Sequence, residues 1–213
     1  MTIVSLSLPW QFGLPVLAGC HLMLWLIATG LKPVLGDRWR PDTVAIWVMS
    51  HACLMMLCWM AQSGVWSICG AMLFCVFIFR LSLVDQLTGL LPRDMTVSCL
   101  ASGLLYAAGI GGGALAGHSF AALLIWCVLF AWRRVGYFRN GREMLGLGDV
   151  WIGSALGAWL GFQSALYAIA AGTSAFLVWL FLSHREGGPM GPWLGGSALA
   201  AMILSLYKPE FVW

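Results

Sequence analysis

Long apolar stretches alternate along the chain with short polar segments that hold most of the charged residues. A bilayer-spanning helix needs about 20 mostly apolar residues. Read in this way, the pattern predicts spans near residues 11–31, 44–62, 65–84, 95–113, 115–132, 150–162, 164–182 and 193–207. Two of these, 115–132 and 150–162, are short, so we expect them to tilt or to continue into the neighbouring turns. The prediction is an all-α polytopic membrane protein with about eight transmembrane helices.

Composition supports this interpretation. Of the 213 residues, 61% are hydrophobic and 9% are charged, whereas about a quarter of a soluble domain is charged. A soluble fold is therefore excluded, and the spans leave little room for a second domain. We expect one membrane-embedded unit over residues 1–213, with the motifs described below confined to about 65–207. The seven cysteines lie in apolar stretches without C-x-x-C spacing, which indicates buried apolar residues rather than a disulfide framework or a zinc site.

The basic residues identify one side of the membrane. Nearly all of them lie in alternate loops: Lys32, Arg38, Arg40, Arg93, Arg133, Arg134, Arg139, Arg142 and Arg185. The intervening loops contain no lysine or arginine. By the positive-inside rule the charged loops are cytoplasmic and both termini are outside. The net charge of +3 therefore reports orientation in a lipid bilayer, and we expect no nucleic-acid partner.

Two aspartates stand at the ends of predicted spans. Asp85 directly follows the third span and Asp149 directly precedes the sixth, so both face the cytoplasm in this topology. Two adjacent carboxyl groups can share one proton, and then one activates water while the other hydrogen-bonds the carbonyl of a peptide. Taken singly, Asp149 is equally well explained as a helix N-cap and Asp85 as a solvated loop residue. Together they are the pair that an aspartyl protease dyad requires.

The glycines before the second aspartate favour a site that admits a peptide. In Gly146-Leu147-Gly148-Asp149, two positions without a side chain would let a substrate strand approach the backbone. A small proton-coupled transporter is the rival, but it requires ionisable groups near the middle of spans. A non-enzymatic assembly subunit would be favoured if either aspartate were missing. Spacing alone leaves protease and transporter both open.

Three segments together resemble the type IV prepilin peptidases, a family of GxGD intramembrane aspartyl proteases. The first segment is Asp85–Pro92, an aspartate followed by a Leu-Pro pair, with Thr96 downstream. The second is Gly141–Val150, which follows the pattern G-R-E-x-M-G-x-G-D-V with Leu145 in the place of methionine. The third is Pro189-Met190-Gly191-Pro192, which is similar to a Pro-Phe-Gly-Pro segment. The three segments occur in the family's order and cover roughly half of the chain.

The resemblance implies a function and a set of site residues. It implies that Asp85 and Asp149 are the catalytic pair and that the substrate is the short basic leader of a prepilin or pseudopilin. Cleavage would take place at the cytoplasmic face of the bacterial inner membrane. No metal or organic cofactor is implied. The particular pilin, the pilus or secretion system served, and the oligomeric state are left open.

Four further residues are candidates for substrate binding. We expect Gly146 and Gly148 to place the backbone in the active site. Glu143 and Asp94 would bind the positive charge of the leader, although each also has a neighbouring arginine with which it could pair.

The chain departs from the family pattern in two places. Larger members have a cysteine-rich loop near the N-terminus, which is linked to N-methylation of the new terminus. Here the first cytoplasmic loop is only Lys32–Asp42 and holds no cysteine. This departure does not favour methyltransferase activity. Trp151 stands where the family often has lysine.

Overall fold

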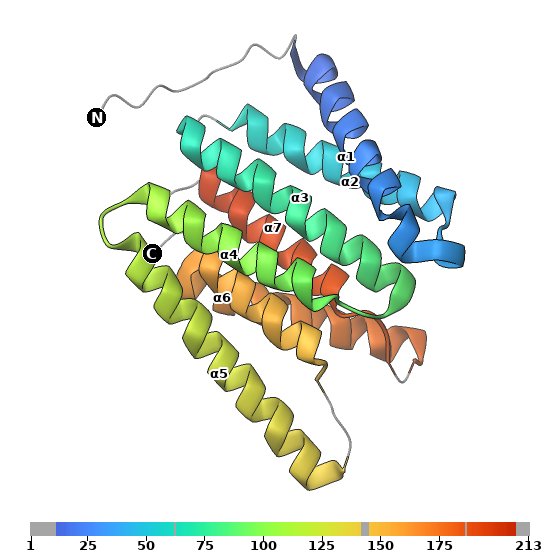
Figure 1. Ribbon diagram of the computed structural model, residues 1–213, viewed down its shortest axis with the longest axis vertical. Coiled ribbons are helices and arrows are strands. Elements are labelled where there is room, and N and C mark those ends of the chain that lie inside the picture. Colours follow the sequence, from blue (N-terminus) through green and yellow to red (C-terminus); the bar gives the residue numbers. More distant parts are fainter. Residues whose placement is uncertain (1–11, 62, 142–144, 186, 208–213) are drawn as a thin grey trace.

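The computed structural model describes residues 12–61, 63–141, 145–185 and 187–207. These residues form seven α-helices, one short 3-10 helix and no β-strand, which confirms the all-α prediction (Figure 1). In chain order the elements are α1 (Gly13–Leu35), η2 (Gly36–Arg38), α2 (Pro41–Met60), α3 (Val65–Thr88), α4 (Arg93–Ile110), α5 (Ala114–Asn140), α6 (Leu147–Ser183) and α7 (Gly191–Tyr207).

Five helical segments of the described chain are long and apolar enough to cross a membrane. They are α1 with η2, α2, α3, α5 and α6, so the chain is a multi-pass membrane protein. Helix α4 begins with the charged residues Arg93 and Asp94, and α7 has only 17 residues. The predicted count of eight spans is therefore not confirmed. Helix α5 continues well beyond the predicted segment 115–132 and ends at Asn140.

Helix α6 contains both of the segments predicted at 150–162 and 164–182. As a straight helix its 37 residues would measure about 55 Å, far more than the hydrocarbon core of about 30 Å. Gly161 interrupts it with φ 73° and ψ 179°, a conformation open essentially only to glycine. The two limbs fold back on each other, because Asp149 and Thr173 line one cavity. A straight helix would hold them more than about 30 Å apart.

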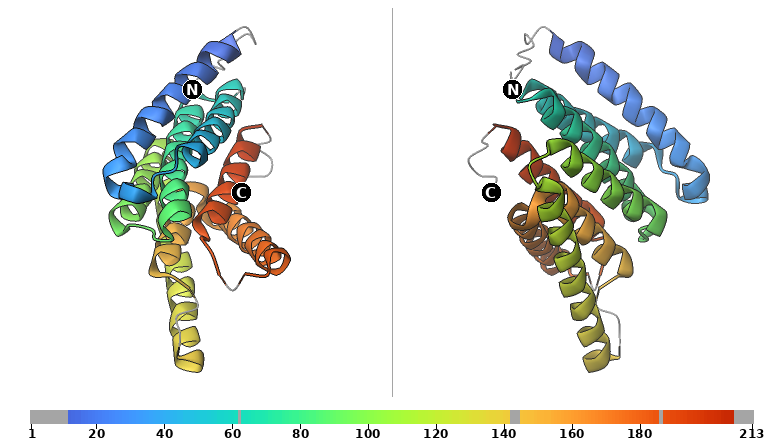
Figure 2. Two further views of the ribbon diagram at one scale, coloured as in Figure 1. Left: turned by 90° about the vertical axis from the view of Figure 1, so that its right-hand side faces the viewer. Right: turned by 60° about the vertical axis from the view of Figure 1, so that its left-hand side comes forward.

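Helix α3 and the first limb of α6 are the most deeply buried parts of the bundle. In the most apolar stretch of α3, 61% of the residues are buried, against 17–33% in the other four membrane-length segments. Helices α1 and α2 form a hairpin on one side of α3, while α4 and α7 lie against its other faces (Figure 2). Large side chains of the core, among them Phe74, Phe79 and Trp159, are fully or almost fully buried.

Polar groups inside the bundle form hydrogen bonds between helices. The Trp159 indole N–H donates to the Cys99 carbonyl at 2.8 Å, and the Ser154 hydroxyl donates to the Ala122 carbonyl at 2.9 Å. In a bilayer such groups have no water as an alternative partner, so these bonds stabilise the contacts of α6 with α4 and α5. All seven cysteines are free thiols.

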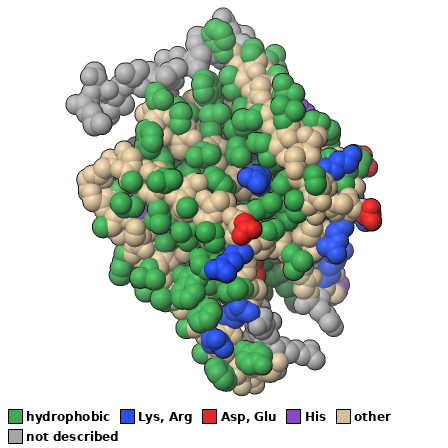
Figure 3. Space-filling view, viewed as in Figure 1, with side chains coloured by type: hydrophobic (Ala, Val, Ile, Leu, Met, Phe, Trp, Pro, Cys, Tyr) green, Lys and Arg blue, Asp and Glu red, His purple; other side chains and the backbone are tan. Residues whose placement is uncertain are grey.

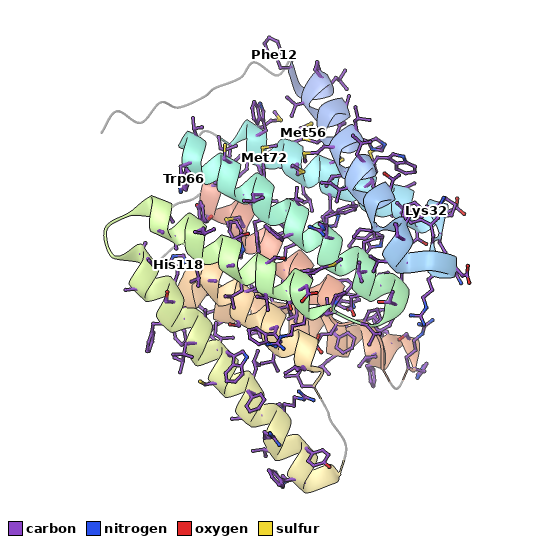
Figure 4. The ribbon with its side chains drawn as sticks, in the orientation of Figure 1. Phe12, Lys32, Met56, Trp66, Met72 and His118 are labelled. Atoms are coloured by element: carbon purple, nitrogen blue, oxygen red, sulfur yellow. The ribbon has the colours of Figure 1, made fainter. Side chains whose placement is uncertain are left out.

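The helix ends are sorted between the two ends of the bundle. Helices α1, α3, α5 and the second limb of α6 end toward the lower right of Figure 1, where α2, α4, α6 and α7 begin. This end also holds Arg38 at the end of η2, Arg93 at the start of α4 and Arg185 just after α6, and we call it the charged end. Charged side chains gather in the lower and right-hand parts of the space-filling view, and hydrophobic ones cover its upper left (Figure 3). His118 and Trp66 lie toward the opposite end (Figure 4).

Candidate active site

Asp85 lies in the last turn of α3, at the charged end of the bundle. Its side chain is 4% exposed, although it is an acid in a membrane-length helix. The helix ends just beyond it because Gly89 adopts the left-handed conformation (φ 69°) and its N–H donates to the Asp85 carbonyl at 2.7 Å. The Arg38 guanidinium donates to the Thr88 carbonyl at 3.0 Å, so the α1–α2 connection supports the helix end that presents Asp85.

The first residue of α7 holds the Asp85 carboxyl group. The N–H of Gly191 donates to Oδ2 of Asp85 at 2.8 Å. Gly191 is buried, and a Cβ atom at this position would lie 2.8 Å from Oδ2. The absence of a side chain is therefore a condition for the contact. Helix α7 begins where the N–H of its first residue, which has no partner within the helix, can donate to an acid.

Asp149 occupies the first turn of α6. Gly146 is the N-cap of this helix, and its backbone N–H donates to Oδ2 of Asp149 at 3.2 Å. An acid in the first turn also interacts favourably with the helix dipole. Each of the two aspartates thus accepts a glycine N–H through Oδ2.

The connection between α3 and α4 brings the two aspartates together. A Cβ atom on Gly148 would lie 2.6 Å from Cβ of Leu91, so the α6 N-terminus packs closely on this loop. The Arg93 guanidinium lies over the Trp151 ring, 5.7 Å from its centroid. Across this contact the Asp85 and Asp149 carboxyl groups lie close enough to interact electrostatically.

The other predicted substrate-binding residues have different positions. Gly146 and Gly148 contact the site as described above. Asp94 is exposed in the first turn of α4. Its neighbour Arg93, a possible pairing partner in the sequence, lies over an indole ring. Glu143 lies outside the described residues. Among the described residues, no group of three or more His, Cys, Asp or Glu side chains is placed to hold a metal ion.

Two contacts of the site were not predicted. The segment Pro189–Pro192 was noted only as part of a resemblance, and the structure gives Gly191 a specific contact with Asp85. A glycine between two prolines at a helix start signals that the backbone is fixed and close to another group. Nothing in the sequence connected Arg38 with the end of α3, because these residues are far apart along the chain.

Comparisons with known proteins identify the family of the chain. The family model for the type IV leader peptidase family matches residues 72–183, more than half of the chain. A prepilin leader peptidase/N-methyltransferase of Pectobacterium carotovorum is 32% identical over 166 residues, which are 70% of this chain and 55% of that protein. The protein of the same name from Dickeya chrysanthemi is 31% identical over 202 residues, 87% of this chain and 68% of that protein.

A third relative with this name, from Burkholderia pseudomallei, is 32% identical over 146 residues. The chain covers 44% of that protein, so it spans roughly half to two thirds of the relatives compared. No solved structure shows a significant match. The family model covers the segment from within α3 to the end of α6, and with it both aspartates. The chain therefore belongs to the type IV leader peptidase family.

Proposed function

We propose that the chain is an intramembrane aspartyl endopeptidase that removes the short basic leader of type IV prepilins or pseudopilins. The observation that carries the proposal is the meeting of Asp85 and Asp149 at one end of the bundle. They come from the end of α3 and the start of α6, and their carboxyl groups are close enough to interact. Related proteins are named for prepilin leader cleavage.

The proposed reaction uses both carboxyl groups on one water molecule. The ionised carboxylate takes a proton from the water, whose oxygen then bonds to the carbonyl carbon of the scissile peptide. The protonated partner donates a hydrogen bond to the carbonyl oxygen. The C–N bond then breaks, and the leaving amine takes a proton from the dyad. Glycine N–H groups donate to Oδ2 of each aspartate and so help to orient the two carboxyl groups for this exchange.

The proposed site lies at the cytoplasmic face of the bacterial inner membrane. Arg38, Arg93 and Arg185 lie at the same end of the bundle as the two aspartates, and basic residues at the ends of spans stay on the cytoplasmic side. A leader with positive charge would approach from this side. Asp94, exposed at the start of α4, and Glu143 are the acids proposed to attract it.

Co-expression with a prepilin tests the proposal. The host is a bacterium without a leader peptidase of its own, and the N-terminus of the pilin is determined by mass spectrometry with and without this chain. We expect a shortened pilin only when the chain is present. A full-length prepilin in both cases, across several prepilins and with the chain shown to be inserted in the membrane, would reject the function.

A further inference from the structure

A cavity of about 340 Å³ lies at the charged end of the bundle, where α2 and α3 meet the end of α6 and the start of α7. Three indole rings from three different helices form much of its wall: Trp47, Trp179 and Trp193. Gln86 and Arg185 also line the cavity, and both are exposed, so the cavity opens to the surface. We call this cavity the indole pocket.

The indole pocket adjoins one of the two candidate catalytic groups. Gln86 lines the pocket and directly follows Asp85 in α3. Pro192 lines it as well and directly follows Gly191, whose N–H donates to Asp85. The pocket therefore has a wall residue next to each partner of this hydrogen bond. A peptide held at Asp85 would have the pocket within reach of a long side chain.

A positive charge already occupies part of the indole pocket. The central carbon of the Arg185 guanidinium lies 5.5 Å from the centroid of the Trp179 ring, within the range of cation–π attraction. The Trp179 and Trp193 centroids are 5.8 Å apart, so a second indole adjoins the first. Arg185 follows the end of α6 at Ser183 and is exposed. Its side chain can therefore leave the ring without disturbing a helix.

The connection from α6 to α7 holds the Trp179 ring in place. A Cβ atom on Gly188 would lie 2.8 Å from this ring, so the backbone packs directly on it. Phe176, about one turn earlier in α6, stacks on the ring with the two centroids 6.0 Å apart. Trp179 is therefore a fixed surface, ready to bind a cation.

We propose that the indole pocket binds a basic side chain of the substrate leader, and that Arg185 competes with the leader for the Trp179 ring. The inference rests on the proposed function, because it assigns part of the same substrate to residues beside Asp85. None of the described residues that line the pocket is acidic, so the faces of the indole rings supply the attraction. A basic side chain of the leader displaces Arg185 when the substrate binds.

An anion, such as the phosphate of a lipid, is the other occupant that Arg185 would suit. The indole rings favour the cation, because the face of an aromatic ring carries negative charge and repels an anion. The two occupants predict opposite effects of removing Arg185. A basic leader would bind more tightly without this competitor, whereas an anion would bind less tightly without its partner.

The test begins with one tagged prepilin that the wild-type chain cleaves. Each basic residue of its leader is changed singly to Gln, and to the other basic residue, and kcat/KM is measured for each version in detergent. At one position we expect the basic versions to be cleaved at least about fivefold faster than the Gln version, since cation–π contacts contribute this much when partly desolvated.

Substitutions of the indoles then test the pocket itself. Trp193→Leu and Trp47→Leu keep an apolar side chain and remove the aromatic face, and we expect each to reduce the basic-to-Gln ratio to about twofold or less. The ratio is read within one variant, so a general loss of activity does not affect it. Trp66→Leu is the matched control, because Trp66 is an indole toward the opposite end of the bundle (Figure 4). It should leave the ratio unchanged.

Removing the competitor gives the sign of the effect. We expect Arg185→Ala to lower KM for the basic version about threefold or more, and to change KM for the Gln version less. Arg139→Ala removes the same charge from the last turn of α5, where it is exposed and does not line the pocket. It should leave KM for both versions unchanged.

The outcomes separate the two proposals. The pocket assignment is wrong, while the protease assignment stands, if the wild-type chain cleaves all leader versions equally or if both tryptophan variants keep the wild-type ratio. An unchanged or higher KM in Arg185→Ala also rejects it, and a higher KM is the result expected for an anion in the pocket. If the wild-type chain cleaves no prepilin at all, the proposed function itself fails, and this inference fails with it.

Discussion

The backbone N–H of Gly191 lies 2.8 Å from Oδ2 of Asp85, which links the first residue of α7 to the last turn of α3. The bond fixes one oxygen of a buried acid. It depends on glycine, because a Cβ atom at residue 191 would lie 2.8 Å from the same oxygen. We regard Gly191 as a positioning residue that acts through Asp85.

Removing this N–H without adding a side chain isolates its role. Incorporation of glycolic acid at position 191 replaces the amide by an ester, and we expect kcat to fall about tenfold or more with KM nearly unchanged, since a hydrogen bond to a charged group contributes about 1.5–3 kcal/mol. Gly191→Ala should also lower kcat. The control is Gly195→Ala, whose Cβ would meet Ile78 and Ser82 on the same helix α3. An equal loss of kcat in this control would show that packing alone is responsible.

The reversal of α6 at Gly161 makes a prediction about stability. With φ 73° and ψ 179°, a residue with a Cβ is strained by about 1–3 kcal/mol, so Gly161→Ala should lower the thermal midpoint of the purified protein. Gly117→Ala is the control, because Gly117 is helical and has open space around its Cα. It should leave stability unchanged or raise it slightly. Equal midpoints for the two variants would contradict the assigned backbone geometry.

Orientation in the membrane is tested with reporter fusions. Fusions after Gly64 and Gly113 should report the periplasm, and fusions after Arg40, Arg93 and Arg142 the cytoplasm, because basic loops are retained inside. A cytoplasmic signal at Gly113 would contradict the topology. It would also place the end of α3 and the start of α6, and with them Asp85 and Asp149, on opposite sides of the membrane.

The helical architecture could be predicted from the sequence because each apolar stretch signals its own helix. The positions of Asp85 and Asp149 at helix ends followed from the same local pattern, and their catalytic role remains a prediction. The number of membrane spans could not be predicted from this local pattern. Helices α4 and α7 are shorter or more polar at their ends than the other spans, and the break in α6 depends on the backbone of Gly161.

The hydrophobic pattern of the sequence could not predict contacts between segments that are far apart along the chain. The bond from Gly191 to Asp85 and that from Arg38 to Thr88 each join separate helices. Periodicity reports which face of a helix is apolar, but it does not report which helix lies opposite. The pattern could not predict the cavity beside Asp149 either, since this cavity forms only where the two limbs of α6 face each other.

The short first loop makes a prediction about the product. We expect the mature pilin to have an unmethylated N-terminus when this chain is the peptidase present, because the connection between α1 and α2 lacks the cysteine-rich segment of larger family members. Mass spectrometry of the mature pilin measures this directly. A methylated product in a host without another prepilin peptidase would show that the short loop is sufficient for transfer.

The central claim is that Asp85 and Asp149 act as one catalytic unit. Asn keeps the shape of the side chain but cannot act as a base, so Asp85→Asn and Asp149→Asn should each lower kcat about a thousandfold or more. The double variant should be no slower than either single one. Asp94→Asn and Glu143→Gln serve as controls and should reduce the rate less than about fivefold, because neither acid is assigned to the catalytic pair and Asp94 is an exposed charge.

The measurement that tests this claim most directly is prepilin cleavage by the two single aspartate variants, each purified and shown to be folded by its thermal midpoint. The account predicts that both variants leave the leader attached under conditions in which the wild-type chain and Asp94→Asn remove it completely. Leader removal at near wild-type rate by folded Asp85→Asn or folded Asp149→Asn would contradict it.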